Sequence, residues 1–212
     1  MSHTSARPKV EERRFVARFL RGILAASLLV GVGSFTPRGN AYLDGPPPGM
    51  TGGFGEDTCY QCHFDYGLNQ GEGSLELEGI PDTYTAGAAY PITVRLTHPR
   101  MERGGFELAV RFSEGDGAGR QAGSLNADDD RVAVILAEGS SVQYARQTED
   151  GSIPEGELAI RWTLRWMAPN EGGGPIIFHV AGNAGNYDES ALGDFPYATQ
   201  FTSRPRLIRP ER

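Results

Sequence analysis

Both cysteines of the chain lie in one five-residue stretch, Cys59-Tyr60-Gln61-Cys62-His63. The spacing C-x-x-C-H is that of a c-type haem attachment site. Two thiols three positions apart can reach the two vinyl groups of one macrocycle. The histidine that follows directly can then bind the iron as its proximal ligand. The pattern therefore predicts a covalently held haem c, with Cys59 and Cys62 as attachment residues and His63 as a ligand of the iron.

Three other uses of the same residues remain open. The two thiols could form a disulfide in an exported protein, although a loop this short is strained and leaves His63 without a role. A thioredoxin-like redox pair would need a strand and a helix around it, whereas a glycine-rich stretch, Gly52–Gly55, precedes the motif. A zinc ion could recruit both thiols and two histidines, which requires several independent coincidences of folding. The histidines concerned are His63, His98 and His179.

The iron of a c-type haem has a second axial position, which is open or is filled by histidine or methionine. His98 is the first candidate for this sixth ligand, because it follows an expected strand on a loop beside Pro99. His179 is the second candidate and Met101 the third. The simpler interpretation of each histidine is an ordinary solvated surface residue.

Residues 1–41 have the pattern of an export signal. A basic front with four arginines between residues 13 and 21 precedes an uncharged, largely apolar run of 14 residues, Gly22–Phe35. That run is too short to span a bilayer comfortably. Small residues follow at Gly39-Asn40-Ala41, so we expect cleavage after Ala41. The mature protein is then expected to be soluble, in the periplasm, at the cell surface or outside the cell. Export agrees with the haem motif, because haem is joined to c-type proteins outside the inner membrane.

The mature chain is strongly acidic. Of the 20 basic and 27 acidic residues in the full sequence, the leader takes seven and two, which leaves 13 and 25 and a net charge of −12. An acidic surface of this size argues against nucleic acid or anionic lipid as a partner. It would suit a positively charged redox partner protein, whose identity the sequence does not give.

The mature chain divides into three parts by composition. Residues 42–73 are rich in glycine and proline and hold the C-x-x-C-H motif. Such a segment cannot pack a core of its own and is too short to be a helical cytochrome c domain. We therefore expect the domain at 74–203, or a partner, to cover the haem. Residues 204–212 are expected to form a tail.

Apolar and polar residues alternate with period two from residue 74 onward, a pattern typical of half-buried strands. The expected strands are Tyr90–Leu96, Phe106–Phe112, Val132–Leu136, Leu158–Trp166 and Ile176–Val180. No sustained helical period follows residue 41, so the fold class is all-β, an antiparallel β-sandwich. Four arginines fall on the outward phase of these strands and could form a stripe that pairs with haem propionates. They are Arg95, Arg111, Arg161 and Arg165. An ordinary polar sheet face is the simpler interpretation.

Several stretches carry a resemblance to a known family: Pro81–Tyr90, Gly105–Leu108, Ala122-Gly123, Trp162–Pro169 and Phe178–Asn186. They resemble the reeler-type sandwich and, more closely, the bacterial reeler-like domain labelled "choice-of-anchor V", over roughly residues 45–200. In that family a glycine-rich C-x-x-C-H segment precedes the sandwich, so the resemblance implies a reeler-like fold behind the haem segment. The chain departs from the family at two positions. Gln147 stands where the family usually has histidine, and His179 where it usually has tyrosine.

Two functions follow from these observations. The first is an exported monohaem cytochrome, for which electron transfer is favoured over catalysis. The alternative is a cell-surface or extracellular binding or adhesion module in which the haem is accessory. A haem enzyme or small-ligand binder with an open sixth position is a third reading. The polar loops Asp128–Asp130 and Asn183–Asp188 could offer oxygens to calcium, but neither matches an EF-hand loop.

Overall fold

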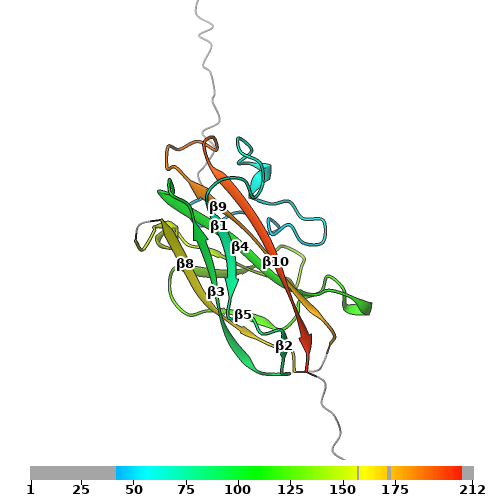
Figure 1. Ribbon diagram of the computed structural model, residues 1–212. Helices are drawn as coiled ribbons and strands as arrows, with labels where there is room; N and C mark the ends of the chain where they lie inside the picture. Colours follow the sequence, from blue (N-terminus) through cyan, green and yellow to red (C-terminus); the bar gives the residue numbers. More distant parts are fainter. Residues whose placement is uncertain (1–41, 157, 171–172, 207–212) are drawn as a thin grey trace, which may run out of the picture. The chain divides into compact units, whose positions relative to one another are not determined.

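The computed structural model describes residues 42–156, 158–170 and 173–206. The predicted leader, its cleavage site and the end of the predicted tail lie outside these residues. Within them the chain forms ten strands and three short 3-10 helices (Figure 1). The strands are β1 (Ser74–Glu78), β2 (Thr83–Tyr84), β3 (Ala89–Thr97), β4 (Arg103–Phe112), β5 (Ser124–Ala127), β6 (Val132–Leu136), β7 (Gln143–Gln147), β8 (Ala159–Met167), β9 (Ile176–Gly185) and β10 (Phe195–Pro205). The helices are η1 (Cys59–Gln61), η2 (Gly115–Gly117) and η3 (Asp150–Ser152). None of the described helices is long and apolar enough to cross a membrane.

The strands form two sheets that pack face to face. One sheet has four strands in the order β1-β3-β8-β5, and the other has six in the order β2-β10-β9-β4-β7-β6. Every pairing is antiparallel except the short one between β2 and β10. The predicted fold class, an all-β antiparallel sandwich, is confirmed.

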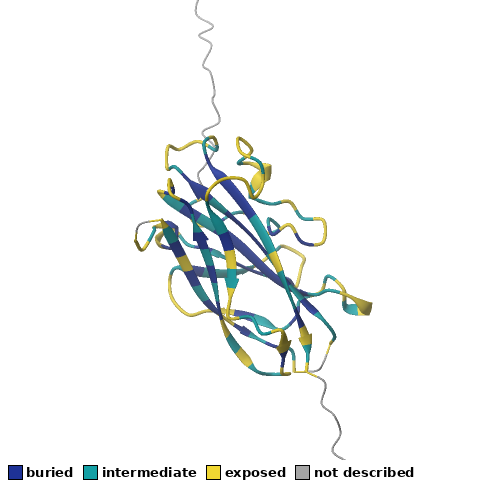
Figure 2. Ribbon diagram, viewed as in Figure 1, coloured by how far each residue is buried: buried dark blue, intermediate teal, exposed yellow. Residues whose placement is uncertain are grey.

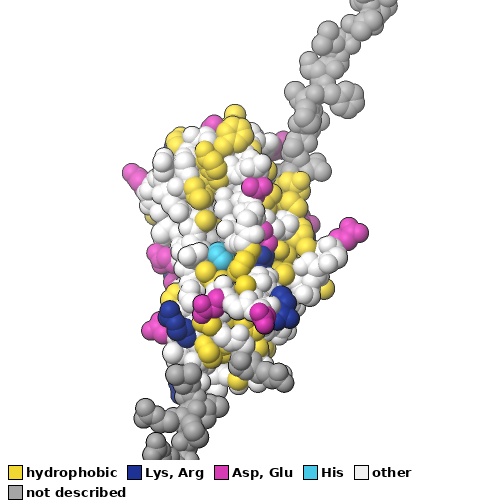
Figure 3. All heavy atoms as spheres, turned by 90° about the vertical axis from the view of Figure 1, so that its right-hand side faces the viewer, with side chains coloured by type: hydrophobic (Ala, Val, Ile, Leu, Met, Phe, Trp, Pro, Cys, Tyr) yellow, Lys and Arg dark blue, Asp and Glu magenta, His cyan; other side chains and the backbone are white. Residues whose placement is uncertain are grey.

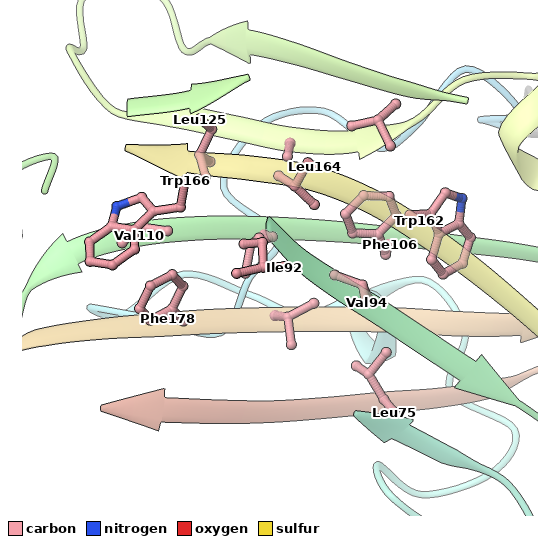
Figure 4. Packing of buried hydrophobic residues seen from close by; sticks show 14 of the residues in the cluster. Leu75, Ile92, Val94, Phe106, Val110, Leu125, Trp162, Leu164, Trp166 and Phe178 are labelled. Carbon is pink, nitrogen blue, oxygen red and sulfur yellow. The ribbon is translucent and has the colours of Figure 1, made fainter. Parts of the chain in front are cut away.

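The core between the sheets is filled by the chain's own side chains (Figure 4). Trp162 on β8 packs against Phe106 on β4 with ring centroids 4.6 Å apart, and Trp166 meets Phe178 on β9 edge to face at 5.0 Å. Both buried indoles also satisfy their N–H groups, since Trp162 Nε1 donates to the carbonyl of Gly151 at 2.8 Å and Trp166 Nε1 to that of Ala122 at 2.9 Å. Each sheet therefore buries its apolar face without a cofactor in the core.

Alternation located the central strands well. The expected strands at Tyr90–Leu96, Phe106–Phe112 and Ile176–Val180 lie inside β3, β4 and β9, and Val132–Leu136 is β6. One residue was placed wrongly. Leu158 was expected on the apolar face of its strand, but it is exposed, has a positive φ of 76° and lies just before β8. A side chain in that left-handed conformation does not continue the pleat of a strand.

The two sheets differ at their outer faces (Figure 2). The outer face of the four-stranded sheet keeps the expected alternation, with exposed Arg161 and Arg165 on β8. Strand β4 is buried on both faces, because its outward residues Glu107 and Arg111 are also covered. The cover is the glycine- and proline-rich residues 42–73, which we call the covering segment.

The predicted arginine stripe is not continuous. Arg95 and Arg161 are paired in register between β3 and β8, and Arg165 follows on the same strand. Arg111 lies on β4 in the other sheet, where it forms a buried ion pair with Glu56. A stripe of all four arginines requires the three strands to be neighbours in one sheet, but β4 belongs to the opposite sheet of the sandwich from β3 and β8.

Candidate functional site

The covering segment crosses the outer face of the six-stranded sheet from β7 to β10, on the right-hand side of Figure 1. At its start Arg146 on β7 donates to the carbonyl of Pro46 at 2.7 Å. At its end Asn69 accepts the backbone N–H of Ala198 on β10 at 2.8 Å. Between these points the segment contacts β4 and β9. The segment that carries the C-x-x-C-H motif is thus held against the sandwich by long-range contacts.

A buried polar cluster docks the middle of the segment. Glu56 forms its ion pair with Arg111 of β4, accepts the hydroxyl of Tyr144 at 2.6 Å and accepts the hydroxyl of Thr51 within the segment. Burial by itself raises the pKa of Glu56, but the hydrogen bonds from Thr51, Tyr144 and Arg111 outweigh it and leave the pKa below its usual value. Glu56 is therefore ionised at neutral pH and pins the segment to β4 and β7.

A second carboxylate lies beside this cluster. Glu107 of β4 is fully buried and accepts the backbone N–H groups of Gly49 and Met50 at 3.0 and 2.5 Å. Its other oxygen, Oε1, has no hydrogen-bond partner among the described residues. Burial raises the pKa of Glu107 to about 7, with the charge of Glu56 adding to the rise. About half of these carboxyls are therefore protonated at neutral pH.

The C-x-x-C-H motif forms one short helical turn. Thr58 caps it by accepting the N–H of Tyr60 with its hydroxyl, and the N–H of His63 donates to the carbonyl of Cys59 at 2.9 Å. Both thiols are free, with Cys62 exposed and Cys59 partly covered. Burial, and then the charge of Glu107, raise the pKa of the Cys59 thiol to about 12. The two thiols and the imidazole therefore all lie on or directly after this single turn.

His63 is fixed by a carboxylate from the loop between β9 and β10. Its Nδ1 lies 2.7 Å from Oδ2 of Asp194, a residue that is 3% exposed. The side chain of His63 itself stays 29% exposed. Because Nδ1 is engaged, Nε2 is the ring nitrogen left to bind a metal ion, which is the usual arrangement for a metal-ligating histidine. The residues present thus fit the proximal side of a haem c.

Apolar side chains surround this turn at the surface. Tyr60 and Phe64 flank His63 along the chain and are 43% and 58% exposed. Tyr187 and Leu192 lie on the β9–β10 loop that holds Asp194, and each is about half exposed. Figure 3, which looks onto the side carrying the covering segment, shows hydrophobic side chains gathered toward its upper end. A flat apolar group bound at His63 would cover such side chains and remove them from water.

The sixth-ligand candidates each have other contacts. His98 is buried, its ring stacks on Phe195 with centroids 3.9 Å apart, and its Nδ1 accepts the N–H of Arg100 at 3.1 Å. Met101 is also buried in the core cluster. Burial, and then the charge of Arg100, lower the pKa of His98. His98 is thus a packed residue at the sandwich edge, and its role as a ligand stays a prediction.

His179 lies on the outer face of β9, beneath the covering segment. A Cβ atom on Gly53 would meet its Nδ1 at 2.5 Å, so only glycine allows the segment to pass this close. The ring of Phe54 meets it edge on at 5.6 Å. Burial, and then the charge of Arg111, lower the pKa of His179. The segment packs on this histidine without needing a haem between them, and its role as a ligand also stays a prediction.

The sequence also suggested a zinc site and calcium-binding loops, and the described residues bear on both. No group of three or more His, Cys, Asp or Glu side chains in residues 42–206, gaps aside, is arranged to hold a metal ion. Asp128 pairs with Arg165 at 2.8 Å, and Asp129 accepts the N–H of Arg131 at 2.9 Å. The loop polarity noted in the sequence is therefore used by contacts within the chain.

Comparison with known proteins gives matches at the level of the fold. No family model matches the chain, and a search of curated proteins finds no match. Among solved structures, the Reelin-N domain of F-spondin is 20% identical with a TM-score of 0.44, covering 69% of this chain and 96% of that one. The human F-spondin reeler domain is 22% identical with a TM-score of 0.41, covering 65% and 93%. A cohesin module from Clostridium perfringens is 11% identical with a TM-score of 0.40, covering 64% and 96%.

Sequence reasoning found the motif but not the residues beneath it. Glu56, Glu107 and Asp194 were not singled out, because each lies far along the chain from its partners. The sequence did carry one indication of them. Glu107 and Arg111 are charged residues that alternate with large apolar residues on β4, so they lie on the outer face of the sheet. Such residues are buried only with a partner, so they point to a covering element.

Proposed function

We propose that this chain is an exported protein with one covalently attached haem c and that it transfers electrons. Cys59 and Cys62 would attach the haem and His63 would bind its iron. The observation that supports the proposal most is the contact between His63 Nδ1 and Asp194, because it leaves Nε2 for iron directly after two free thiols on one helical turn. The choice-of-anchor V resemblance supports the same order of haem segment and sandwich.

The residues around the motif have distinct roles in this proposal. A bound haem c supplies a one-electron iron couple. The exposed aromatic residues Tyr60 and Phe64 would shield one edge of the haem from water, and the polar cluster at Glu56 would keep the segment docked. Because Cys62 is exposed, a haem attached there would lie at the surface, where a redox partner could approach it closely. The acidic mature surface favours a basic partner.

Haem attachment is tested by expressing the chain with a c-haem maturation system. We expect one haem that survives acid–acetone extraction and gives a stained band under denaturing conditions. The matched variant Cys59→Ala with Cys62→Ala should lose that band, and a reduced-minus-oxidised spectrum should yield a midpoint potential for the unaltered chain. A stained band in the double variant, or none in the parent, would refute the proposal. Mass spectrometry of the same exported protein should place its N-terminus near Tyr42.

A surface binding module is the second candidate function. The observation in its favour is the complete sandwich core, which needs no haem to bury its apolar residues. The reeler and cohesin domains that resemble the chain are sandwiches of the same general kind, at identities that show the fold alone. A chain that folds, is exported and carries no haem would leave this candidate in place of the first.

A further inference from the structure

The loop between β9 and β10 brings a buried carboxylate to the candidate iron ligand. We propose that Asp194 is the positioning residue of His63: it accepts the Nδ1 proton, holds Nε2 free for the haem iron and strengthens the imidazole as an electron donor. This inference rests on the proposed haem function, and it adds that the site is built for a low reduction potential.

The carboxylate of Asp194 is itself held in place. Its Oδ1 accepts the backbone N–H of Asn186 at 3.0 Å, and its Oδ2 accepts the side-chain amide of Asn183 at 3.2 Å as well as His63 at 2.7 Å. Both asparagines belong to β9 or to the start of the β9–β10 loop. Contacts within the β9–β10 hairpin therefore set the direction of the carboxylate that meets the imidazole.

The carboxylate defines which proton lies between the two groups, because Oδ2 of Asp194 can only accept and lies 2.7 Å from His63 Nδ1. The amide of Asn183 lies beside them, with its Nδ2 at 3.3 Å from His63 Nδ1 and 3.2 Å from Asp194 Oδ2. Turning the amide round would face its oxygen toward the Asp194 carboxylate, which places two acceptors together. The amide orientation is thus fixed even though Asn183 Oδ1 has no partner among the described residues. With Nδ2 donating to Asp194, the proton on Nδ1 is free to do the same.

The consequence for a bound haem follows from the basicity of the ligand. A histidine that donates to a buried carboxylate carries more negative charge on its ring than one that donates to water or to a carbonyl. Such a ligand stabilises the oxidised iron more than the reduced iron, so it lowers the reduction potential. Asp194 is 3% exposed, and water therefore screens this effect little.

The test compares two variants of the haem-loaded protein. Asp194→Asn removes the charge with little change of shape. Asp65→Asn is the matched control, because Asp65 accepts the N–H of Gly193 at 2.9 Å and so holds the same loop without touching His63 Nδ1. We expect covalent haem in the parent and in both variants. The midpoint potential should shift to more positive values in Asp194→Asn and stay near that of the parent in Asp65→Asn.

Equal shifts in the two variants would overturn the inference, since the loop and not the carboxylate would then set the potential. No shift in either variant would overturn it as well, because the charge of Asp194 would then have no effect on the potential. A second measurement does not need the haem. Nitrogen-15 NMR of the mature chain expressed without haem maturation should find His63 protonated on Nδ1, and Asp194→Ala should turn it to the Nε2-protonated form. An Nε2-protonated ring in the parent would overturn the inference. Absence of covalent haem from the parent would instead refute the proposed function.

Discussion

Glu56 of the covering segment and Arg111 of strand β4 form an ion pair, and both side chains are largely buried. Arg111 also donates to the hydroxyl of Tyr144 at 2.9 Å, and that hydroxyl donates in turn to Glu56. The three side chains close a small ring of contacts between the segment and two strands. A segment too polar and too short to fold alone is thereby given a fixed position on the sheet.

Removing one member of this ion pair should release the covering segment. Glu56→Ala leaves the Arg111 guanidinium buried without its carboxylate, a loss of about 3–5 kcal/mol for a buried pair. We expect limited proteolysis to cut within residues 42–73 of the variant well before it cuts the sandwich. Chemical denaturation monitored at the two tryptophans should report the remaining stability of the sandwich.

A matched control for this prediction is the exposed ion pair on the other sheet. Glu76 and Arg95 lie 3.3 Å apart with the Glu76 side chain 50% exposed. Glu76→Ala should cost less than about 1 kcal/mol and leave the covering segment protected. Equal protease sensitivity of the two variants would show that the buried pair does not dock the segment.

Glu107 should make the chain less stable as the pH rises. Burial raises the pKa of this carboxyl from 4.5 to about 7, so the folded state keeps a proton that the unfolded state has lost. The contribution of Glu107 to the free energy of unfolding is therefore largest below pH 4.5. It falls between about pH 4.5 and 7 and stays constant above about pH 7. The full change is roughly 3 kcal/mol for a shift of this size.

Glu107→Gln keeps an oxygen for the N–H groups of Gly49 and Met50 and cannot ionise. Urea titrations of the haem-free chain from pH 4.5 to 8 should show a smaller fall in stability for this variant than for the parent. Glu102→Gln, at an exposed position just before β4, serves as the control and should follow the parent curve. A parent-like fall in Glu107→Gln would assign the pH dependence to other groups.

The sequence revealed the strands whose two faces meet different surroundings. On β3 and β8 one face meets the core and the other meets water, so apolar and polar residues alternate from Ile92 to Leu96 and from Ile160 to Trp166. Strand β10 was not predicted, because its outward residues are partly covered and its sequence, Phe195–Pro205, mixes apolar and polar residues on both faces. Periodicity reports a contrast in residue type between the two faces of a strand. Glu107 and Arg111 give that contrast to β4 although both of its faces are buried, whereas β10 lacks it.

The candidate site was predictable only where it is local in sequence. Cys59, Cys62 and His63 form a motif because haem attachment depends on their spacing along one turn. Asp194 reaches His63 through the pairing of β9 with β10, and no spacing rule links the two residues. The covering segment was recognised as unable to fold alone, but its route over the sheet depends on Glu107 and Arg111, whose burial cannot be read from their type.

The sandwich should fold without haem, because its core consists of its own side chains. Trp162 is fully buried against Phe106, and Trp162→Ala should lower the free energy of unfolding by about 3–5 kcal/mol. Leu158→Ala, at an exposed position four residues earlier, should change it by less than about 0.5 kcal/mol. Circular dichroism and urea denaturation of the chain expressed without haem maturation measure both. An unfolded parent would mean that haem contributes to the core.

The two thiols of the haem-free chain should react at different rates. Cys62 is exposed, whereas burial and the nearby Glu107 raise the pKa of the Cys59 thiol to about 12, so almost none of it is thiolate at pH 8. We expect a maleimide or a disulfide reagent to modify Cys62 first, and Cys59 to follow only in denaturant. Mass spectrometry of peptides after short exposures resolves the order. Equal rates in the native state would show that the segment does not dock without haem.

The sixth ligand of the iron is best tested at the two packed histidines. His98 stacks on Phe195, and His179 lies beneath Gly53 and Phe54, so either ring must break contacts of its own to reach a haem. We expect His98→Ala and His179→Ala each to lower the melting temperature, and the variant that removes the sixth ligand also to change the spin state of the ferric haem. Near-infrared magnetic circular dichroism distinguishes the ligand sets. Loss of a low-spin signature in one variant alone would identify that histidine as the ligand and show that its ring turns toward the iron when haem is attached. Retention of the signature in both would leave a methionine or an added ligand opposite His63.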